Sequence, residues 1–116
     1  MSIQNEYVRE IFIYGNEFWR FYESQNSKTQ KKIDWTIDLV RTLEKIPEQY
    51  FKHLEGTNGL YEIRVKLGTN IFRIFSFFDE GRLVILLNGF QKKTQKTPKN
   101  EIKKALKLKD EYYESK

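Results

Sequence analysis

The sequence contains no cysteine and only 2 prolines and 6 glycines among its 116 residues. The absence of cysteine excludes a disulfide scaffold, a thiolate zinc site and a cysteine nucleophile. The scarcity of proline and glycine, together with 39% hydrophobic residues, excludes collagen-like and disordered chains. No apolar run reaches the roughly 20 residues that a membrane-spanning helix needs. The length is that of one ordinary domain, so we expect a single globular domain over residues 1–116.

Signals for targeting and for familiar chemistries are missing too. The first residues, MSIQNEYVRE, lack the basic and apolar regions of a secretory signal, so we expect a cytoplasmic protein that contacts no membrane. The chain has no GxxxxGK[ST] phosphate loop, no HExxH motif and no carboxylate cluster with metal-ligand spacing. We therefore expect no cofactor and no metal site. The only histidine, His53, has no obvious partner for acid–base work, and we expect it to be a surface residue.

The net charge of +5 is concentrated at one end of the chain. Residues 1–91 contain 12 basic and 12 acidic side chains, whereas residues 92–116 contain 9 lysines and 4 acids. A localised basic segment attracts polyanions by counterion release, but a solvated lysine-rich helix face has the same composition. Charge alone leaves both interpretations open.

Hydrophobic patterning predicts an α+β domain in the order β-α-α-β-β-β-α, with helices packed on a small antiparallel sheet. Residues 7–14 have a strand-like composition, and residues 17–25 (EFWRFYESQ) predict a short aromatic helix. Ser27 and Gln30 predict a capping box that opens a second helix, which ends before Pro47. The apolar stripe of this helix is Ile33, Ile37, Val40, Leu43 and Ile46.

After a loop that contains His53, the period changes from helical to strand-like. Residues 61–67, 71–78 and 83–90 predict three strands joined by two tight turns, an antiparallel meander. Thr97 and Pro98 predict the cap and the first residue of a final helix. Its expected inward face is Ile102, Ala105, Leu106 and Tyr113.

The turns fix a register for this meander. If Gly68-Thr69 is a two-residue loop, Arg64 lies directly opposite Arg73 on the neighbouring strand. If Glu80-Gly81 is a two-residue loop as well, Arg73 lies opposite Asn88, so that three polar groups form one row. Like charges in facing positions of a sheet cost about 0.2–1 kcal/mol. The row is explained either by a neutralising carboxylate such as Glu62 or by a bound phosphate, which guanidinium groups recognise with paired donors.

The segment over residues 59–106 resembles the HigB-like, phage-derived branch of the RelE/ParE toxin superfamily. The resemblance is carried by LYEIR, FRIF, LLNGF and the KKTQKTP block before the terminal helix. It implies a RelE/ParE-like fold and a toxin of a type II toxin–antitoxin pair. The activity implied is a metal-independent endoribonuclease that cuts translated mRNA on the ribosome through attack of the RNA 2′-hydroxyl on the adjacent phosphate.

The resemblance also implies roles for individual residues. Arg64 and Arg73 match the two arginines of the family hairpin and would bind the scissile phosphate, and Lys92 and Lys93 match the paired lysines that would act as base or acid or hold RNA. The candidate catalytic residues are therefore Arg64, Arg73, Lys92 and Lys93. The candidate RNA-binding residues are Lys66, Asn88, Lys96, Lys99, Lys103 and Lys107. Asn88 stands where many relatives have histidine, and an amide cannot act as an acid or base there.

The expected partners are a helix-turn-helix antitoxin, the ribosome and mRNA. Trp19, Phe21 and Trp35 exceed what a small core needs, which favours a protein-binding surface. Two alternatives to the nuclease remain: a ParE-like inhibitor that binds DNA gyrase without catalysis, and an inactive phage-derived relic that only binds its antitoxin. The basic residues at 64, 73 and 92 favour the nuclease, because ParE proteins usually lack the catalytic cations.

Overall fold

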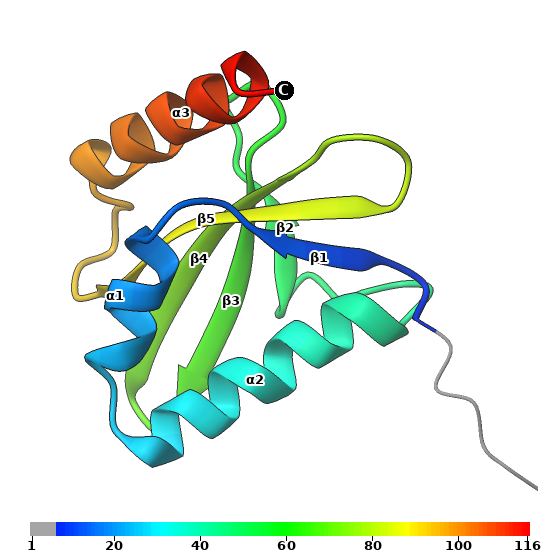
Figure 1. The fold of residues 1–116 in the computed structure, drawn as a ribbon. Coiled ribbons are helices and arrows are strands. Elements are labelled where there is room, and N and C mark those ends of the chain that lie inside the picture. Colours follow the sequence, from blue (N-terminus) through cyan, green and yellow to red (C-terminus); the bar gives the residue numbers. More distant parts are fainter. Residues whose placement is uncertain (1–6) are drawn as a thin grey trace, which may run out of the picture.

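The computed structural model describes residues 7–116, which form three helices and one five-stranded sheet (Figure 1). The α+β class is confirmed. Residues 1–6, part of the segment considered above for a secretory signal, lie outside the described residues. In chain order the elements are β1 (Glu10–Ile13), α1 (Glu17–Glu23), α2 (Ser27–Thr42), β2 (Phe51–His53), β3 (Tyr61–Leu67), β4 (Asn70–Phe78), β5 (Leu83–Lys92) and α3 (Lys99–Glu114).

The sheet has the strand order β1-β5-β4-β3-β2 and differs from the expected one in two respects. It is mixed rather than antiparallel, because β1 pairs with β5 in parallel. It also contains β2, a short edge strand antiparallel to β3 that was expected to be loop. Three residues are too few to display an alternating pattern, so the sequence carries no signal for this strand.

The β3–β4 hairpin forms as its turn predicts. Gly68 has φ +62°, a conformation that glycine adopts without strain, and Leu67 pairs with Asn70 across the two-residue loop. Arg64 therefore pairs with Arg73, which confirms the predicted register of the first hairpin.

The register predicted for the second hairpin is wrong. The connection after Phe78 is longer than two residues, since the first pair of this hairpin is Phe78 with Val84. A β-bulge between Ile74 and Ser76 then shifts the register once more. As a result, Arg73 pairs with Phe90 rather than with Asn88.

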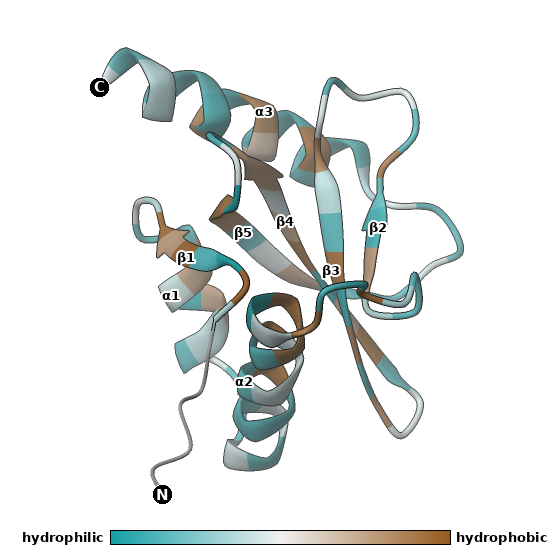
Figure 2. Ribbon diagram, turned by 90° about the vertical axis from the view of Figure 1, so that its right-hand side faces the viewer, coloured by the Kyte–Doolittle hydropathy of each residue, from teal (hydrophilic) through white to brown (hydrophobic). Residues whose placement is uncertain are grey.

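The helices cover opposite faces of the sheet (Figure 1). On one face, α1 and α2 pack against an apolar cluster that includes Phe18, Ile33 and Ile74. On the other face, α3 packs through Ala105 and Tyr112. Apolar segments of the helices are turned toward the strands and polar segments toward solvent (Figure 2). Within residues 7–116 no helix has the length and apolar character to cross a membrane.

Four local predictions about the helices need correction. Helix α2 ends at Thr42, so Leu43 and Ile46 lie beyond it and not on its apolar stripe. Asn26, not Ser27, caps α2, since its side chain accepts a hydrogen bond from the Thr29 N–H. Pro98 rather than Thr97 occupies the cap position of α3, and the Thr97 hydroxyl is used elsewhere. The inward face of α3 contains Ile102, Ala105, Leu108 and Tyr112, whereas Leu106 and Tyr113 are exposed.

Candidate nucleic-acid interface

Basic side chains occupy two neighbouring rows on the sheet face that α3 covers. The first row consists of Arg64, Arg73 and Phe90, and the second consists of Lys66, Ile71 and Lys92. Since side chains alternate along a strand, Arg73 lies on the same face as Phe75, which packs in the cluster beneath α3. Helix α3 begins only at Lys99, and its main contacts with the sheet are to β5 and β4. On β3, Arg64 is half-buried and Lys66 is exposed, so this corner of the face is open to solvent.

Asn88 does not join this row. Together with Leu87 it falls in the bulge opposite Phe75, and the residue is only 1% exposed. Its amide nitrogen donates to the backbone oxygen of Glu101 at 3.1 Å and to the Glu101 carboxylate at 3.0 Å. Asn88 thus fastens α3 to the sheet and presents no group to solvent.

Glu62 lies between the two arginines. It is on the same face of β3 as Arg64, and its side chain is 4% exposed. The Oε1 atom lies 3.3 Å from Nε of Arg64 and 3.7 Å from Nε of Arg73. The Oε2 atom accepts a hydrogen bond from the Thr97 hydroxyl at 3.3 Å. One buried carboxylate therefore offsets one of the two positive charges and leaves the cluster with a net positive charge.

Burial governs the electrostatics of Arg73. Loss of solvent lowers the pKa of Arg73, the Glu62 carboxylate opposes this shift, and the Arg64 guanidinium adds to it. The direction agrees with the packing, since Nε of Arg73 is buried and has no hydrogen-bond partner. Nη1 of Arg73 donates to the Phe72 carbonyl at 3.2 Å. Arginine stays protonated under such shifts, so Arg73 is a buried cation whose charge is only partly balanced.

Two shallow hollows meet at Ile71. One, of about 180 Å³, is bordered by both arginines and Lys66, and the other, of about 420 Å³, is bordered by Lys92 and Lys93. Nζ of Lys92 donates to the Gln95 carbonyl at 2.8 Å, which folds the basic loop 93–98 back over the end of β5. The two hollows together form a surface, lined by cations, that an extended anionic chain can cross.

The remaining predicted lysines lie outside these hollows. Lys93 and Lys96 are exposed in the loop, and Lys99, Lys103 and Lys107 are exposed on α3. None of these five has an ion-pair partner within residues 7–116. A neighbouring lysine, Lys104, does pair with Glu17 and Glu101. His53 is exposed on β2 with its ring against Tyr61, as expected of a surface residue.

Thr97 is the site residue that sequence reasoning missed. Its position before Pro98 is typical of a helix cap, and that local pattern hides its contact with Glu62, which is 35 positions away. Glu62 itself was identifiable, because it shares its strand face with Arg64 and lies within one row of Arg73. We call Arg64, Arg73, Glu62 and Thr97 the arginine cluster.

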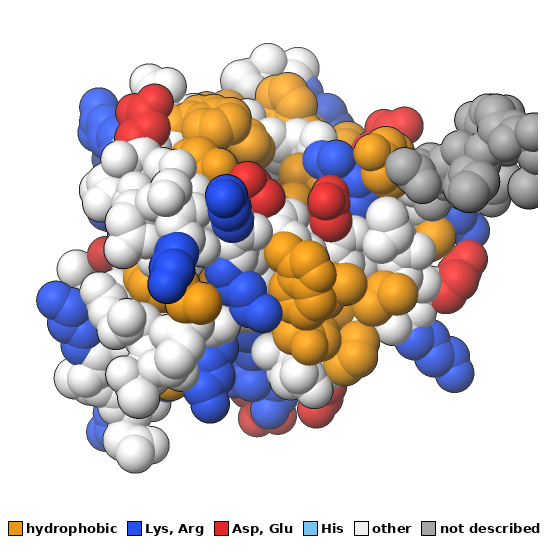
Figure 3. Space-filling view, turned by 90° about the horizontal axis from the view of Figure 1, so that it is seen from below, with side chains coloured by type: hydrophobic (Ala, Val, Ile, Leu, Met, Phe, Trp, Pro, Cys, Tyr) orange, Lys and Arg blue, Asp and Glu red, His pale blue; other side chains and the backbone are white. Residues whose placement is uncertain are grey.

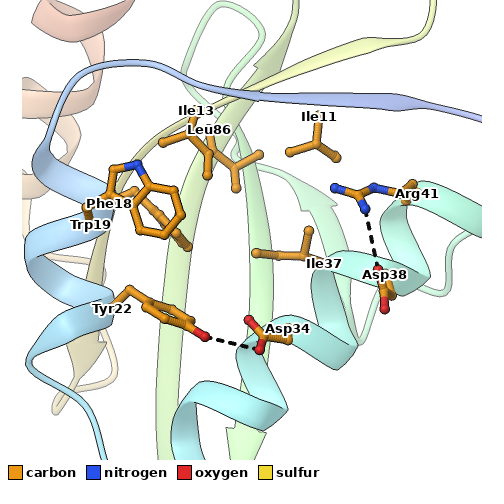
Figure 4. A pocket seen from close by; sticks show the side chains of 10 residues that line it. All are labelled: Ile11, Ile13, Phe18, Trp19, Tyr22, Asp34, Ile37, Asp38, Arg41 and Leu86. Carbon is orange, nitrogen blue, oxygen red and sulfur yellow. Dashed lines mark hydrogen bonds and ion pairs between the residues drawn. The ribbon is translucent and has the colours of Figure 1, made fainter.

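The opposite face of the sheet has a hollow of different chemistry. A groove of about 290 Å³ lies between β1, α1 and α2 (Figure 4). Its lining is mainly apolar, and two carboxylates of α2 lie at its rim, where Asp34 accepts a hydrogen bond from Tyr22 and Asp38 pairs with Arg41. The lining residues are Ile11, Ile13, Phe18, Trp19, Tyr22, Asp34, Ile37, Asp38, Arg41 and Leu86.

The three aromatic residues singled out above have different positions. Trp19 lines this groove and is 44% exposed. Trp35 is also 44% exposed, but it lies outside the groove and packs on Tyr50. Phe21 is buried in the core. Seen from the side of α2, the surface displays hydrophobic side chains among both acidic and basic ones (Figure 3).

Comparison with known protein families places most of the chain in one family. Residues 20–110 match the family described as "Phage derived protein Gp49-like (DUF891)". The match includes α2, every strand except β1, and all the candidate catalytic residues. No curated protein matches the chain.

Proposed function

Since the chain belongs to the phage-derived Gp49-like family, we propose that it is a toxin that cleaves translated mRNA on the ribosome. The family is of the RelE/ParE type found in toxin–antitoxin systems, and the α+β fold with its mixed sheet is consistent with that type. The family description names neither a substrate nor a reaction. The nuclease activity, its HigB-like character and the residues that perform it are our proposal.

One observation carries this proposal: Arg64 and Arg73 are paired across β3 and β4, and both border a shallow hollow of about 180 Å³. Two guanidinium groups side by side supply several planar N–H donors, which suit the oxygens of a phosphate. Attack of a 2′-hydroxyl on the adjacent phosphate builds negative charge on the phosphate oxygens. Cations already in place stabilise that charge without having to reorganise.

The lysines supply the rest of the proposed chemistry. Lys66 and Lys92 flank Ile71 next to the arginine pair, and Lys93 follows in the loop. In our proposal, the RNA backbone passes across the hollows at Ile71, and Lys92 or Lys93 takes part in proton transfer or holds the RNA. Lys96, Lys99, Lys103 and Lys107 extend the positive surface toward ribosomal RNA. Asn88 has no part in RNA contact, because its amide is engaged by Glu101.

The test is expression of the protein from an inducible promoter, with Arg73→Ala beside it. The proposal expects growth arrest together with loss of intact mRNA, and neither effect in the variant. Growth arrest with intact mRNA and altered plasmid supercoiling would contradict the nuclease and indicate a gyrase inhibitor. Normal growth together with stable binding of an antitoxin would identify an inactive relic.

We propose further that the partner is a helix-turn-helix antitoxin that contacts the groove on the α1–α2 face. The groove offers apolar side chains and the half-exposed Trp19, and aromatic residues of this kind are the usual anchors of protein interfaces. Asp34 has no cation within ion-pair distance among residues 7–116, so a lysine or arginine of the antitoxin would complement the rim. Co-expression followed by size-exclusion chromatography tests the complex, and separate elution would contradict it.

A further inference from the structure

Glu62 has no part in the catalytic and RNA-binding roles described above. A carboxylate that is 4% exposed is costly to bury unless it is paired. Glu62 has three partners: Nε of Arg64, Nε of Arg73 and the hydroxyl of Thr97. These come from β3, β4 and the loop before α3, so one side chain joins three separate segments.

The direction of these contacts matters. Glu62 approaches both arginines at Nε, on the inner edge of each guanidinium group. Within the described part of the chain, neither Nη atom of Arg64 makes a hydrogen bond, and on Arg73 only Nη1 is engaged, by the Phe72 carbonyl. The carboxylate thus restrains the inner edge and leaves the outer donors free for an anion.

The contact with Thr97 adds a second connection. Thr97 lies at the end of the loop that carries Lys93 and Lys96, and its hydroxyl donates to Oε2 of Glu62 at 3.3 Å. The opposite oxygen of the same carboxylate faces the arginines. The position of the basic loop is therefore connected to the orientation of the guanidinium groups through a single carboxylate.

We propose that Glu62 is a positioning residue, which orients Arg64 and Arg73 toward the phosphate and, through Thr97, holds the basic loop beside them. This inference rests on the proposed nuclease function. A carboxylate so close to the phosphate site also repels the anion. Glu62 therefore raises the turnover rate through orientation and weakens ground-state binding through its charge.

Glu62→Gln tests both effects, because the amide has nearly the same size but lacks the charge that holds both guanidinium groups at Nε. The phosphate site then has one more net positive charge. We expect inorganic phosphate to bind at least about threefold more tightly, the size of one charge interaction near the surface. We expect kcat for mRNA cleavage to fall about ten- to a hundredfold, because misplaced groups lose their alignment. KM should fall together with kcat.

Two measurements provide the result. Phosphate titration followed by the Nε–H NMR signals of Arg64 and Arg73 reports anion affinity and guanidinium order without any cleavage. Cleavage kinetics in a translating extract give kcat and KM. A purely structural role for Glu62 would lower thermal stability and kcat together without tighter phosphate binding, and that result would overturn the proposal.

Thr97→Val provides an independent arm, should the Glu62 variant fail to fold. It keeps the carboxylate and removes only the tether, so we expect kcat to fall severalfold while phosphate affinity stays unchanged. Thr42→Val is the matched control, because the Thr42 hydroxyl also makes a single hydrogen bond, to the Asp38 carbonyl on α2. Equal kcat values for the two threonine variants would contradict the tether. A wild type that cleaves no mRNA but binds phosphate as expected would overturn the proposed function alone.

Discussion

The two faces of the sheet are built from the same alternating strands, yet they differ in chemistry. On the α1–α2 face, Ile63 and Val65 of β3 pack with Ile74 of β4 in an apolar core. On the α3 face, the neighbouring positions of β3 are charged, and Glu62 and Arg64 meet Arg73. Two helices cover the first face and a single helix covers part of the second (Figure 1). The uncovered part is where charges can be kept half-buried and still reach solvent.

This difference separates two tasks. The α3 face carries fixed cations, which we propose bind RNA, and the α1–α2 face carries an apolar groove, which we propose binds the antitoxin. A partner bound in the groove leaves the arginine cluster on the other side of the sheet. We therefore expect an antitoxin in the groove to inhibit only if it also blocks access to the ribosome or extends around the molecule to the arginine cluster.

Removal of Arg73 should have the largest effect of the changes considered. It should slow mRNA cleavage, a property of the α3 face, and leave antitoxin binding at the α1–α2 face nearly unchanged. Loss of one donor that stabilises transition-state charge costs about 2.7–4 kcal/mol, so we expect Arg73→Ala to slow mRNA cleavage about a hundred- to thousandfold. Antitoxin affinity should stay within about twofold. Arg82→Ala is the matched control, because Arg82 lies at the far end of β4 and β5 and bonds to the Val8 carbonyl. Similar loss in both variants would mean that overall charge, not this site, governs cleavage.

Truncation of Trp19 should affect the other face, so that antitoxin binding weakens and mRNA cleavage does not change. We expect Trp19→Ala to weaken antitoxin binding by about 2 kcal/mol, close to thirtyfold, while cleavage activity is preserved. Trp35→Ala is a close control, since Trp35 is on α2, has the same 44% exposure and lies outside the groove. Isothermal titration calorimetry with purified antitoxin measures both. Equal antitoxin affinities of the Trp19→Ala and Trp35→Ala variants would show that the antitoxin does not bind in the groove.

Gly89 tests the tight packing of the apolar face. A β-carbon at this position would lie under 3 Å from the ring of Phe21, as α1 crosses β5. Overpacking of this kind costs about 1–3 kcal/mol, so Gly89→Ala should lower the free energy of unfolding by that amount in chemical denaturation. Phe21→Ala should recover part of the loss when the two changes are combined. An additive loss would show that the cost of the added methyl group does not come from the Phe21 ring.

The lysines of α3 should have the smallest effect. We expect replacement of Lys99, Lys103 and Lys107 by Gln to make the slope of log K for ribosome binding against log salt concentration less steep. The slope should change by up to about three, close to one per lost phosphate contact. Lys28 and Lys31, which are exposed on α2, and Lys45, which is exposed shortly after it, give a matched triple variant. Binding measured between low and moderate salt decides the matter. If the slope does not change, these lysines are only a solvated helix face.

Local turn chemistry predicts one half of the candidate site. The two-residue turn at Gly68 fixes the pairing of Arg64 with Arg73, because a single glycine with positive φ leaves only one compact hairpin. The second hairpin could not be predicted in this way. Its longer connection and the bulge near Ile74 each shift the register by one residue, and neither has a distinctive sequence signal.

Long-range contacts account for the other misses. Thr97 has the residue type and position of a helix cap, but its hydroxyl bonds to Glu62 of a distant strand. Tyr112 rather than Tyr113 is the tyrosine that α3 buries against the sheet, because its hydroxyl reaches Asp79 at 2.7 Å and its ring packs on Phe77. Periodicity along one helix cannot distinguish these adjacent tyrosines, since the choice depends on where the β4–β5 connection lies.

Mapping of RNA 5′ ends in a translating extract shows whether the arginine cluster cleaves mRNA on the ribosome. We expect new 5′ ends within translated codons with the wild-type protein, none with Arg73→Ala, and none on the same RNA without ribosomes. Intact mRNA in an extract whose translation continues, beside disturbed DNA supercoiling in cells that express the protein, would contradict the claim and favour a gyrase inhibitor.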